Sequence, residues 1–448
     1  MALTGIQIFK LLPKTNCKEC GFPTCLAFAM QLALGKVELA KCPYVSEEAK
    51  SQLEDAAAPP IRTVVIGKEK SELKIGGETV LFRHDKTFVN PPIIAISITD
   101  EMDDERVEER ISKLGDLSYE RVGLILRAEL VFLEDKGKDN EKFLRIIDKV
   151  KAKGDIGLIL ASKSKEQLSK ALEKCKDMKP LIYAAEESNV EEMGNLAKQY
   201  GCPLAVKAEN IEKLPQIVEK LTQLGLKDMV LDSGARDMKT LYRDQIAIRR
   251  APLLKKFKPF GFPTITFPSQ MTDDYMKEAL YASVLIAKYA GIIVLSDLKG
   301  ETLFPLLVER LNIYTDPQRP MMVKQGIYQI GQPDDSSPVL VSTNFALTYF
   351  VVSGEVENSR KSAWLLIQDT EGLSVLTAWA ADKFVAETIS SFVKKSGIES
   401  KVKHRKLIIP GYVASILGEL EEELPDWEIL LGPREAATIP AYLKQWQA

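Results

Sequence analysis

Four of the six cysteines lie in the first 42 residues of this chain, and their spacing suits a metal centre. Cys17, Cys20, Cys25 and Cys42 follow the pattern C-x2-C-x4-C-x16-C, and Pro43 follows the last of them. Thiolates at such spacings form disulfides, bind zinc or hold an iron–sulfur cluster. The chemistry of this segment is therefore that of sulfur ligands.

An iron–sulfur cluster fits the spacing best. Disulfides are disfavoured because the first residues lack the basic segment of a secretory signal, so we expect a cytoplasmic protein. Structural zinc usually takes two short cysteine pairs, and the second pair is missing, although a four-thiolate zinc site stays open. A tight loop bent by Gly21 and Pro23 can supply three ligands and a distant Cys-Pro the fourth. We predict a [4Fe–4S] cluster on these four cysteines.

Composition excludes several other classes. His84 and His404 are the only histidines, which disfavours histidine triads and histidine metal sites. Lys and Arg number 60 against 63 Asp and Glu, so the basic surplus of a nucleic-acid binder is missing. No uncharged apolar run reaches the about 18 residues that cross a membrane. We expect no nucleic-acid or membrane partner, and several domains in 448 residues.

The cysteine loop needs a small helical module to hold it. Residues 26–34 are apolar and helix-forming up to Gly35, and residues 46–54 begin with the capping residue Ser46 and two acids. The run 56–60, Ala-Ala-Ala-Pro-Pro, resembles a linker. These signals predict an iron–sulfur domain over residues 1–58.

The pattern then changes to alternating strands and helices. Segments 62–66 and 79–83 flank Gly76 and Gly77 and predict an N-terminal hairpin. Eight short apolar runs follow, each with a helical stretch after it, and this pattern predicts a central (β/α)8 TIM barrel within residues 59–315. The runs are 93–98, 122–126, 156–161, 181–185, 204–206, 229–231, 265–267 and 292–295.

Polar residues after the barrel strands are the candidates for barrel chemistry. Lys207 and Asp232 are expected at the barrel mouth. No nucleophile-plus-base pattern accompanies them, so we expect ion pairs or contacts to another protein instead. The full set of candidates is Asp100, Glu129, Lys163, Glu186, Lys207, Asp232, Ser233 and Asp297.

Beyond a second proline-containing linker at 316–320, residues 316–448 predict a flavodoxin-like or Rossmann-like α/β domain. Its strands are expected at 339–342, 364–367, 406–409 and 428–431. The segments after them are rich in Gly, Ser and Thr, which suits a large polar cofactor at the sheet edge, whereas a G-x-G-x-x-G dinucleotide motif is missing. Ordinary turns and helix caps remain the alternative reading of these segments.

The whole chain resembles a known family. The segment 4–25, TGIQIFKLLPKTNCKECGFPTC, the later Cys42-Pro43, the barrel and the C-terminal α/β unit together resemble the large (gamma) subunit of the corrinoid iron–sulfur protein of the reductive acetyl-CoA (Wood–Ljungdahl) pathway. The resemblance implies a heterodimer with a small subunit and a cobamide in the C-terminal domain. It also implies a methyl group as cargo.

The resemblance implies a component of methyl transfer rather than a stand-alone enzyme. A bound Co(I) cobamide accepts methyl from methyltetrahydrofolate through a methyltransferase and delivers it to acetyl-CoA synthase, and the cluster reactivates Co(II). A reductive activator or ferredoxin is then a further partner. No D-x-H-x-x-G motif is present, which agrees with the base-off cobamide without a histidine ligand that the family implies.

The corrinoid contacts are expected in the loops after the four C-terminal strands. The expected residues are Thr343, Thr348, Gly372, Leu373, Ser374, Val375, Leu376, Thr377, Gly411, Tyr412, Gly432, Pro433, Arg434, Glu435 and Ala436. One alternative is an iron–sulfur electron-transfer enzyme with catalysis in the barrel and no cobamide. Another is a zinc-stabilised scaffold protein.

Overall fold

The computed structural model describes residues 4–33, 37, 39–46, 49, 53, 59–121, 123–316 and 320–448. Contacts divide the chain into two compact units. The first consists of Met1–Leu81, Val89–Leu117 and Ala128–Arg310, and the second of Phe82–Phe88, Ser118–Arg127 and Leu311–Ala448. Most of the predicted helix 46–54 and of the predicted linkers 56–60 and 316–320 lies outside the described residues.

Two short helices build the cysteine-bearing module. Helix α1 (Gly5–Leu11) begins at Thr4, whose hydroxyl accepts from the Gln7 N–H in a capping box. Helix α2 (Cys25–Ala33) confirms the helix predicted over residues 26–34. Ile8 of α1 and Phe28 of α2 are buried in their shared core, so the packing of the two helices fixes the loop between them.

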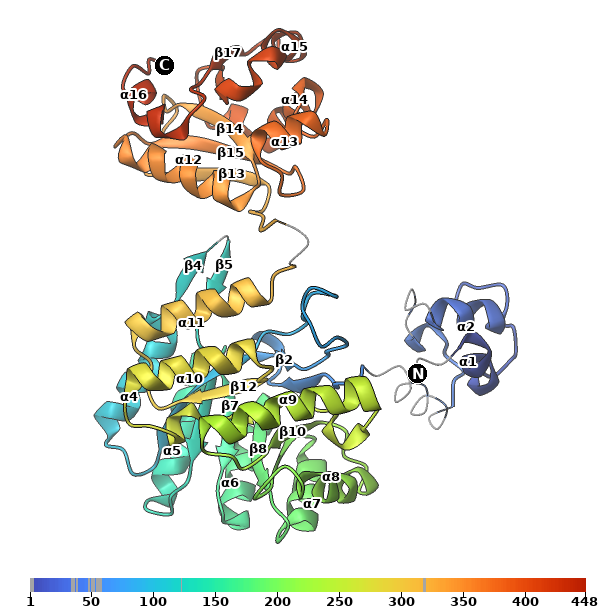
Figure 1. The fold of residues 1–448 in the computed structure, drawn as a ribbon. Helices are drawn as coiled ribbons and strands as arrows, with labels where there is room; N and C mark the ends of the chain where they lie inside the picture. The colour runs from blue at the N-terminus through green and yellow to red at the C-terminus, as the bar shows by residue number, and fades with distance from the viewer. Residues whose placement is uncertain are drawn as a thin grey trace. The chain divides into compact units, whose positions relative to one another are not determined.

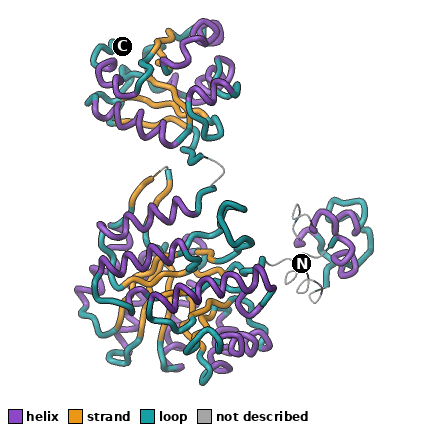
Figure 2. Tube along the Cα trace, in the orientation of Figure 1, coloured by secondary structure: helices purple, strands orange, loops and turns teal. Residues whose placement is uncertain are grey.

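The central part is a barrel of eight parallel strands (Figures 1 and 2). Their order around the sheet begins at β10 and ends at β11, and a parallel bridge between Leu231 and Thr264 joins these two ends. The strands are β3 (Ile93–Thr99), β6 (Leu130–Glu134), β7 (Gly157–Ala161), β8 (Leu181–Ala185), β9 (Leu204–Lys207), β10 (Met229–Asp232), β11 (Ile265–Thr266) and β12 (Ile292–Leu295). The predicted (β/α)8 barrel is therefore confirmed.

A helix follows each barrel strand. Side chains cap several helix N-termini, as Asp103, Ser164 and Asp274 do by accepting hydrogen bonds from backbone N–H groups of the first turn. The eight helices are α4 (Asp104–Asp116), α5 (Asn140–Lys153), α6 (Lys165–Cys175), α7 (Val190–Tyr200), α8 (Leu214–Gln223), α9 (Met238–Lys255), α10 (Tyr275–Ala287) and α11 (Gly300–Ile313). They surround the strands as an outer layer (Figure 1).

The prediction of a second barrel strand at residues 122–126 is wrong. Strand β5 (Leu124–Leu126) pairs antiparallel with β4 (Tyr119–Arg121), and the second barrel strand is β6. Leu124 and Ile125 are 51% and 63% exposed, whereas the apolar residues of β6 are almost fully buried. The apolar run alone did not distinguish the two segments because burial depends on the neighbouring strands.

The prediction that residues 79–83 form the second strand of the hairpin is also wrong. Strand β1 (Val64–Ile66) pairs with β2 (Leu73–Ile75) rather than with residues 79–83. Val64, Ile66 and Ile75 are fully buried in the core cluster inside the barrel. The hairpin therefore contributes side chains to the barrel core.

The C-terminal sheet has five strands in the order β13-β15-β14-β16-β17. The four predicted strands correspond to β14 (Val339–Thr343), β15 (Ala363–Gln368), β16 (Lys406–Ile409) and β17 (Glu428–Leu431), which are mutually parallel. Strand β13 (Gly326–Ile330) was not predicted and pairs antiparallel with β15 at one edge. Its side chains are mostly half-buried, so it lacks the continuous apolar run of the inner strands.

Helices cover both faces of this sheet. One face packs on α12 (Ala346–Asn358) and α16 (Ile439–Leu443). The other packs on α13 (Val375–Ala380), α14 (Ala386–Ser396) and α15 (Leu417–Glu423). The connection from β14 to β15 crosses one face of the sheet, and the connection from β16 to β17 crosses the other. The chain therefore leaves the neighbouring strands β14 and β16 in opposite directions, and the point between them is the divergence point of the sheet. In open α/β sheets, ligands bind at such a divergence point.

Candidate functional site

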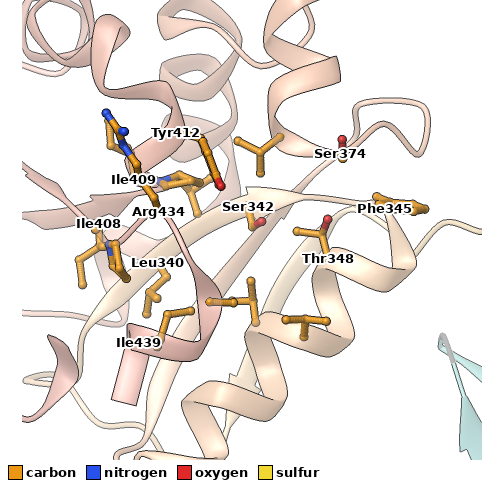
Figure 3. A pocket seen from close by; sticks show the side chains of 18 of the residues that line it. Leu340, Ser342, Phe345, Thr348, Ser374, Ile408, Ile409, Tyr412, Arg434 and Ile439 are labelled. Atoms are coloured by element: carbon orange, nitrogen blue, oxygen red, sulfur yellow. The ribbon is translucent and has the colours of Figure 1, made fainter. Parts of the chain in front are cut away.

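A cavity of about 310 Å³ opens at the divergence point between β14 and β16 (Figure 3). Leu340 and Ser342 of β14 and Ile408 of β16 form part of its base. Thr348 and Val351 of α12 line one side. The lining is mostly apolar with a few hydroxyl groups, which is the usual composition of a small-molecule site.

Three buried polar atoms at the ends of β14 and β15 have no hydrogen-bond partner among the residues that the structure describes. They are the Ser342 hydroxyl, the Thr343 hydroxyl and the Gln368 carbonyl oxygen. Ser342 is 3% exposed and lines the cavity. A buried polar group without a partner costs about 1–3 kcal/mol, so a ligand or water that pairs with Ser342 would recover stability.

The predicted corrinoid contacts divide into two groups. Nine line the cavity: Thr348, Ser374, Val375, Leu376, Tyr412, Gly432, Pro433, Arg434 and Ala436. Six do not line it: Thr343, Gly372, Leu373, Thr377, Gly411 and Glu435.

The residues of the second group hold the lining residues in place. Thr343 is fully buried and neighbours Gln368 in register across the two strands. The Gly372 N–H donates to the Asn344 side-chain oxygen at 2.9 Å, and the same oxygen accepts from the Thr370 N–H at 3.0 Å. Asn344 therefore fixes the loop that leads to Ser374.

Two glycines allow the loops after β16 and β17 to pack closely. A Cβ on Gly411 would lie 2.5 Å from the Gly432 carbonyl oxygen, and a Cβ on Gly432 would lie 2.9 Å from the Ile409 oxygen. At the rim, the Tyr412 hydroxyl donates to the Glu435 carboxylate, and this bond raises the pKa of Tyr412. Glu435 thus orients a ring that lines the cavity.

Sequence reasoning missed the apolar part of the lining. The predicted contacts include nine lining residues, and eleven others, most of them apolar and on the strands or α12, were not among them: Leu340, Val341, Ser342, Phe345, Leu347, Val351, Val352, Ile408, Ile409, Pro410 and Ile439. A usable signal was present in α12, because Leu347 and Val351 are apolar on the helix side away from the core and remain exposed. A helix that is apolar on every side indicates burial on both sides.

The four N-terminal cysteines lie near one another in the first unit. Cys25 and Cys42 are buried, Cys20 is half-buried and Cys17 is exposed. Burial raises the pKa of Cys42, and the neighbouring thiols Cys20, Cys25 and Cys17 raise it further. The Asn16 N–H points to the Cys25 sulfur at 3.4 Å, and the Cys25 N–H donates to the Asn16 side chain at 2.8 Å.

Four cysteine thiolates are the usual ligands of an iron–sulfur cluster, so these four residues fit such a cluster. Lys14, Asn16 and Lys18 have positive φ angles of 59°, 51° and 67°, and Gly21 has one of 81°, so the loop winds tightly around Cys17 and Cys20. Among the described residues, no three His, Cys, Asp or Glu side chains already stand in a metal-binding arrangement.

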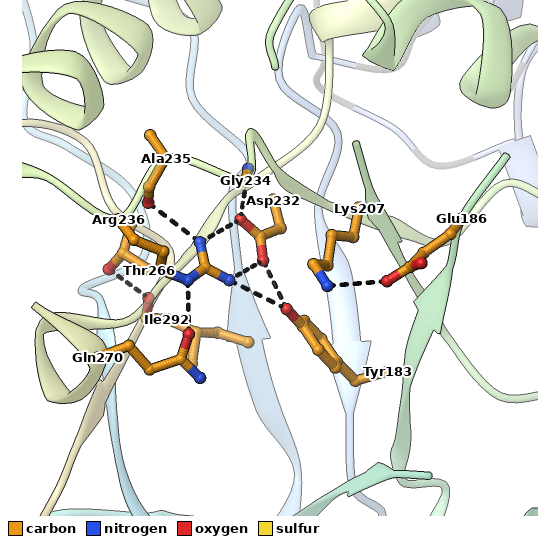
Figure 4. A network of polar contacts seen from close by, with 10 residues as sticks. All are labelled: Tyr183, Glu186, Lys207, Asp232, Gly234, Ala235, Arg236, Thr266, Gln270 and Ile292. Atoms are coloured by element: carbon orange, nitrogen blue, oxygen red, sulfur yellow. Dashed lines mark hydrogen bonds and ion pairs between the residues drawn. The ribbon is translucent and has the colours of Figure 1, made fainter. Parts of the chain in front are cut away.

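The barrel mouth holds a network of polar contacts (Figure 4). The Arg236 guanidinium binds both Asp232 oxygens, at 3.0 and 2.7 Å, and the Tyr183 hydroxyl donates to Asp232 at 2.6 Å. The Gly234 N–H donates to the same carboxylate at 2.9 Å. Arg236 also donates to Gln270 at 2.5 Å and lies over the Phe267 ring. Burial, together with Asp232, raises the pKa of Tyr183 far above its usual value.

The other barrel candidates are also engaged. Lys207 pairs with Glu186 at 2.8 Å, and Asp297 pairs with Lys113 at 3.0 Å. Asp100 accepts from the N–H groups of Lys136, Lys138 and Asp139; burial opposes its ionisation, but these hydrogen bonds prevail and lower its pKa.

Three further candidates differ from these. Glu129 was expected after a strand but precedes β6, and it forms a partly buried ion pair with Arg310 at 2.7 Å. Ser233 is buried beside the Asp244 carboxyl, and Lys163 is exposed. The candidates therefore form ion pairs and loop contacts rather than a nucleophile with a base.

Two protein-family models match the chain. A family model described as "CO dehydrogenase/acetyl-CoA synthase delta subunit" matches residues 63–443, and one described as "Putative Fe-S cluster" matches residues 12–44. In the part of the chain that the structure describes, no helix has the length and apolarity to cross a membrane.

Full-length relatives are similar to the chain. A corrinoid/iron-sulfur protein large subunit of Moorella thermoacetica is 43% identical, with 99% of each chain covered. An acetyl-CoA decarbonylase/synthase complex subunit gamma of Methanopyrus kandleri is 33% identical over 99% of this chain and 98% of its own. An aldolase structure from Thermotoga maritima, phospho-2-dehydro-3-deoxyheptonate aldolase, is 15% identical with a TM-score of 0.39, and the match covers 55% of this chain and 72% of the aldolase. The chain belongs to the family of corrinoid/iron–sulfur protein large subunits and acetyl-CoA decarbonylase/synthase gamma subunits.

Proposed function

We propose that the chain is a methyl-group carrier of acetyl-CoA synthesis, with a cobamide in its C-terminal domain and a [4Fe–4S] cluster at its N-terminus. The cavity with the unpartnered Ser342 hydroxyl is the single observation that most supports the cobamide site. The names of full-length relatives support both cofactors. When bound, a cobamide supplies a cobalt ion that can accept and release a methyl group.

The cavity suits the detached lower base of a cobamide. Leu340, Val351 and Ile409 offer apolar walls to a flat aromatic group, and Ser342 offers a hydrogen bond to its polar edge. A cobamide is larger than the cavity, so Ser374, Tyr412 and the other rim residues would contact the rest of it. The strand order of the parallel part, in which the second strand precedes the first, is that of flavodoxin-like sheets and supports this assignment.

Neither histidine of the chain lines the cavity. One ring nitrogen of His404 lies 2.9 Å from the Ser337 carbonyl oxygen and the other accepts from the Lys406 N–H at 3.2 Å. His84 stacks on Phe82. This arrangement supports a cobamide held base-off without a protein histidine as lower ligand.

The cysteine module would return an electron to the corrinoid centre when it has been oxidised to Co(II). Cluster potentials reach down to roughly −700 mV, which covers the range needed for this reduction. A ferredoxin or reductive activator would supply the electron. Cys17 lies on the surface, so the electron has a short path into the module.

We propose three functional parts: residues 1–58 for the cluster, 59–315 for the barrel with its hairpin, and 316–448 for the cobamide. The small subunit, the methyltetrahydrofolate:corrinoid methyltransferase and acetyl-CoA synthase are the proposed partners. The alternative of a barrel-centred iron–sulfur enzyme is less well supported, because Asp232, Lys207 and Asp297 are all engaged in ion pairs.

Anaerobic purification with metal analysis and EPR tests the proposal. We expect one [4Fe–4S] cluster and one cobamide per chain after co-expression with the small subunit, and a base-off Co(II) signal that disappears on low-potential reduction. Cys25→Ser should lose the cluster and keep the cobamide, whereas the buried Cys175→Ser control should keep both. Iron without cobalt would contradict the cobamide site, and zinc alone would contradict the whole proposal.

A further inference from the structure

A short hairpin from within the barrel sequence belongs to the compact unit of the C-terminal sheet. Residues 118–127, which contain β4 and β5, lie between α4 and β6 in the chain, yet their contacts group them with residues 311–448. Within the described chain the two strands pair with each other alone. Side chains, rather than a shared sheet, therefore hold the hairpin in this unit.

One of these side chains contacts helix α12. The Arg121 guanidinium lies over the Phe350 ring, 5.3 Å from the ring centre. Arg121 is half-buried, and its buried Nε atom has no hydrogen-bond partner among the described residues. The face of an aromatic ring attracts a cation, and the attraction is stronger where water is excluded. Phe350 therefore provides a favourable contact that holds the Arg121 charge against the helix.

The neighbouring Glu120 lies near two phenols of the same region. Burial raises the pKa of Tyr328 in β13 and of Tyr349 in α12, and the Glu120 carboxylate raises both further. The two phenol rings are 5.0 Å apart, and the Tyr349 ring is 5.5 Å from that of Phe350. The hairpin thus meets a continuous aromatic surface on α12 and β13.

Another side of α12 lines the cavity. Four of its residues do so: Leu347, Thr348, Val351 and Val352. A helix turns about 100° per residue, so these four side chains share one side, and Phe350 lies roughly 130° away from the middle of it. One helix therefore contacts the cavity with one side and the hairpin with another, and a change in the hairpin contact would move the cavity wall.

The sheet by itself holds α12 with small side chains. Three of the 13 residues of this helix are buried, and they are Ala346, Ser353 and Val356. Helix α14 on the other face buries larger ones, among them Ile389 and Phe392. Small buried side chains remove little apolar area from water, so the position of α12 depends more on its other contacts.

We propose that Arg121 is a positioning residue of the cofactor cavity, and that through Phe350 it holds α12 where the cavity stays open. The inference rests on the proposed function, because it takes the ligand of this cavity to be the cobamide. The part of the chain that binds the cofactor then includes residues 118–127 as well as 316–448.

The test measures cobamide binding to the full chain by absorbance titration. Arg121→Ala should raise the Kd for cobamide about 3- to 10-fold, because α12 loses a contact that holds it beside the cavity. Arg121→Lys keeps a cation over the ring and should restore most of the affinity. Phe350→Leu should resemble Arg121→Ala, and the double variant should be no weaker than either, because the two residues act through one contact.

Arg405→Ala is the matched control. Arg405 also lies over an aromatic ring, that of Trp427 at 5.7 Å, and it donates to the Val402 carbonyl at 3.1 Å. Trp427 belongs to the core on the face of the sheet opposite to α12. This variant should lose stability in thermal unfolding and keep its affinity for cobamide. An equal loss of affinity in Arg405→Ala and Arg121→Ala would show a general effect of stability and overturn the inference.

Hydrogen exchange gives a readout that needs no cobamide. Amides of residues 346–358 should exchange faster in Arg121→Ala, and those of 386–396 should not. If the unchanged chain binds cobamide and Arg121→Ala binds it equally well, this inference alone is overturned. If the unchanged chain binds no cobamide, the proposed function fails, and faster exchange of α12 in Arg121→Ala would still show that Arg121 positions this helix.

Discussion

The barrel and the C-terminal sheet both present the carboxyl ends of parallel strands, yet their polar groups differ. At the barrel mouth, Asp232 is bound by Arg236, Tyr183 and Gly234, so its charge is already compensated. At the C-terminal sheet, the buried Ser342 hydroxyl has no hydrogen-bond partner among the described residues, and it lines an open cavity. The comparison teaches that polar residues at a strand end indicate a candidate ligand site when an unpaired group among them also faces an open cavity.

The largest expected effect tests the cavity directly. Val351→Trp would fill the space between α12 and the strands, and Val351 is exposed enough for the fold to accept the change. We expect the cobalt content per chain to fall more than about 10-fold, because the ligand loses most of its apolar contact. Lys207→Trp at the barrel mouth is the control and should keep its cobalt. Equal cobalt content in the two variants would contradict a cobamide site in this cavity.

The next effect concerns the barrel network. Asp232→Ala leaves the Arg236 charge without its partner and should destabilise the protein by about 3–5 kcal/mol. Tyr183→Phe removes one donor and should cost about 1 kcal/mol. Denaturant unfolding followed by fluorescence measures both. A stable Asp232→Ala protein that binds cobamide but no longer transfers methyl would show that the barrel mouth is a catalytic site.

A smaller effect is expected at Ser342. Ser342→Ala removes a buried hydroxyl that has no partner, so the stability of the cofactor-free protein should not fall. The affinity for cobamide should fall about 5- to 10-fold, since the hydrogen bond to the ligand is lost. Equilibrium titration followed by absorbance gives the affinity. Ser353→Ala, whose hydroxyl donates to the Phe350 carbonyl at 3.3 Å, is the control: it should lose stability and keep its affinity.

The smallest effect is a pH dependence of the barrel. Burial raises the pKa of Glu278 above its ordinary value, although Ser296 donates to it through both its N–H and its hydroxyl. A carboxyl whose pKa is raised by folding stabilises the fold below its unfolded pKa and loses this contribution as pH rises through the folded value.

Glu278→Gln cannot ionise, so its stability relative to the unchanged chain should increase as pH rises from about 4 through 7. Urea unfolding at several pH values measures the difference. A difference that stays constant with pH would show that Glu278 ionises as easily in the folded protein as in the unfolded one.

Much of the fold could be predicted because it depends on local patterns. Seven of the eight barrel strands and the four parallel C-terminal strands follow from short apolar runs at regular spacing. The error at residues 122–126 arose because Leu124 and Ile125 are apolar but exposed in a hairpin. Strand β13 escaped prediction because an edge strand has no continuous apolar run.

The candidate site could be predicted only in part. Thr348, Ser374, Tyr412 and Arg434 were named because they follow strands, and the cavity includes them. Leu340 and Ile408 were not, because an apolar strand residue looks the same whether it faces a core or a cavity. That distinction depends on which helix covers the strand.

The sequence by itself determined the spacing of the four N-terminal cysteines, the shortage of histidine and most of the order of strands and helices, because residue type and spacing are local properties. Only the tertiary structure decided which polar groups are satisfied and which are left without partners. Asp232 is the last residue of β10, and Ser342 is the last but one of β14. The residues around them in the sequence do not indicate that Asp232 binds an arginine whereas Ser342 faces a cavity. Hydrogen-bond partners come from segments distant in the chain, so pairing is a property of the assembled fold.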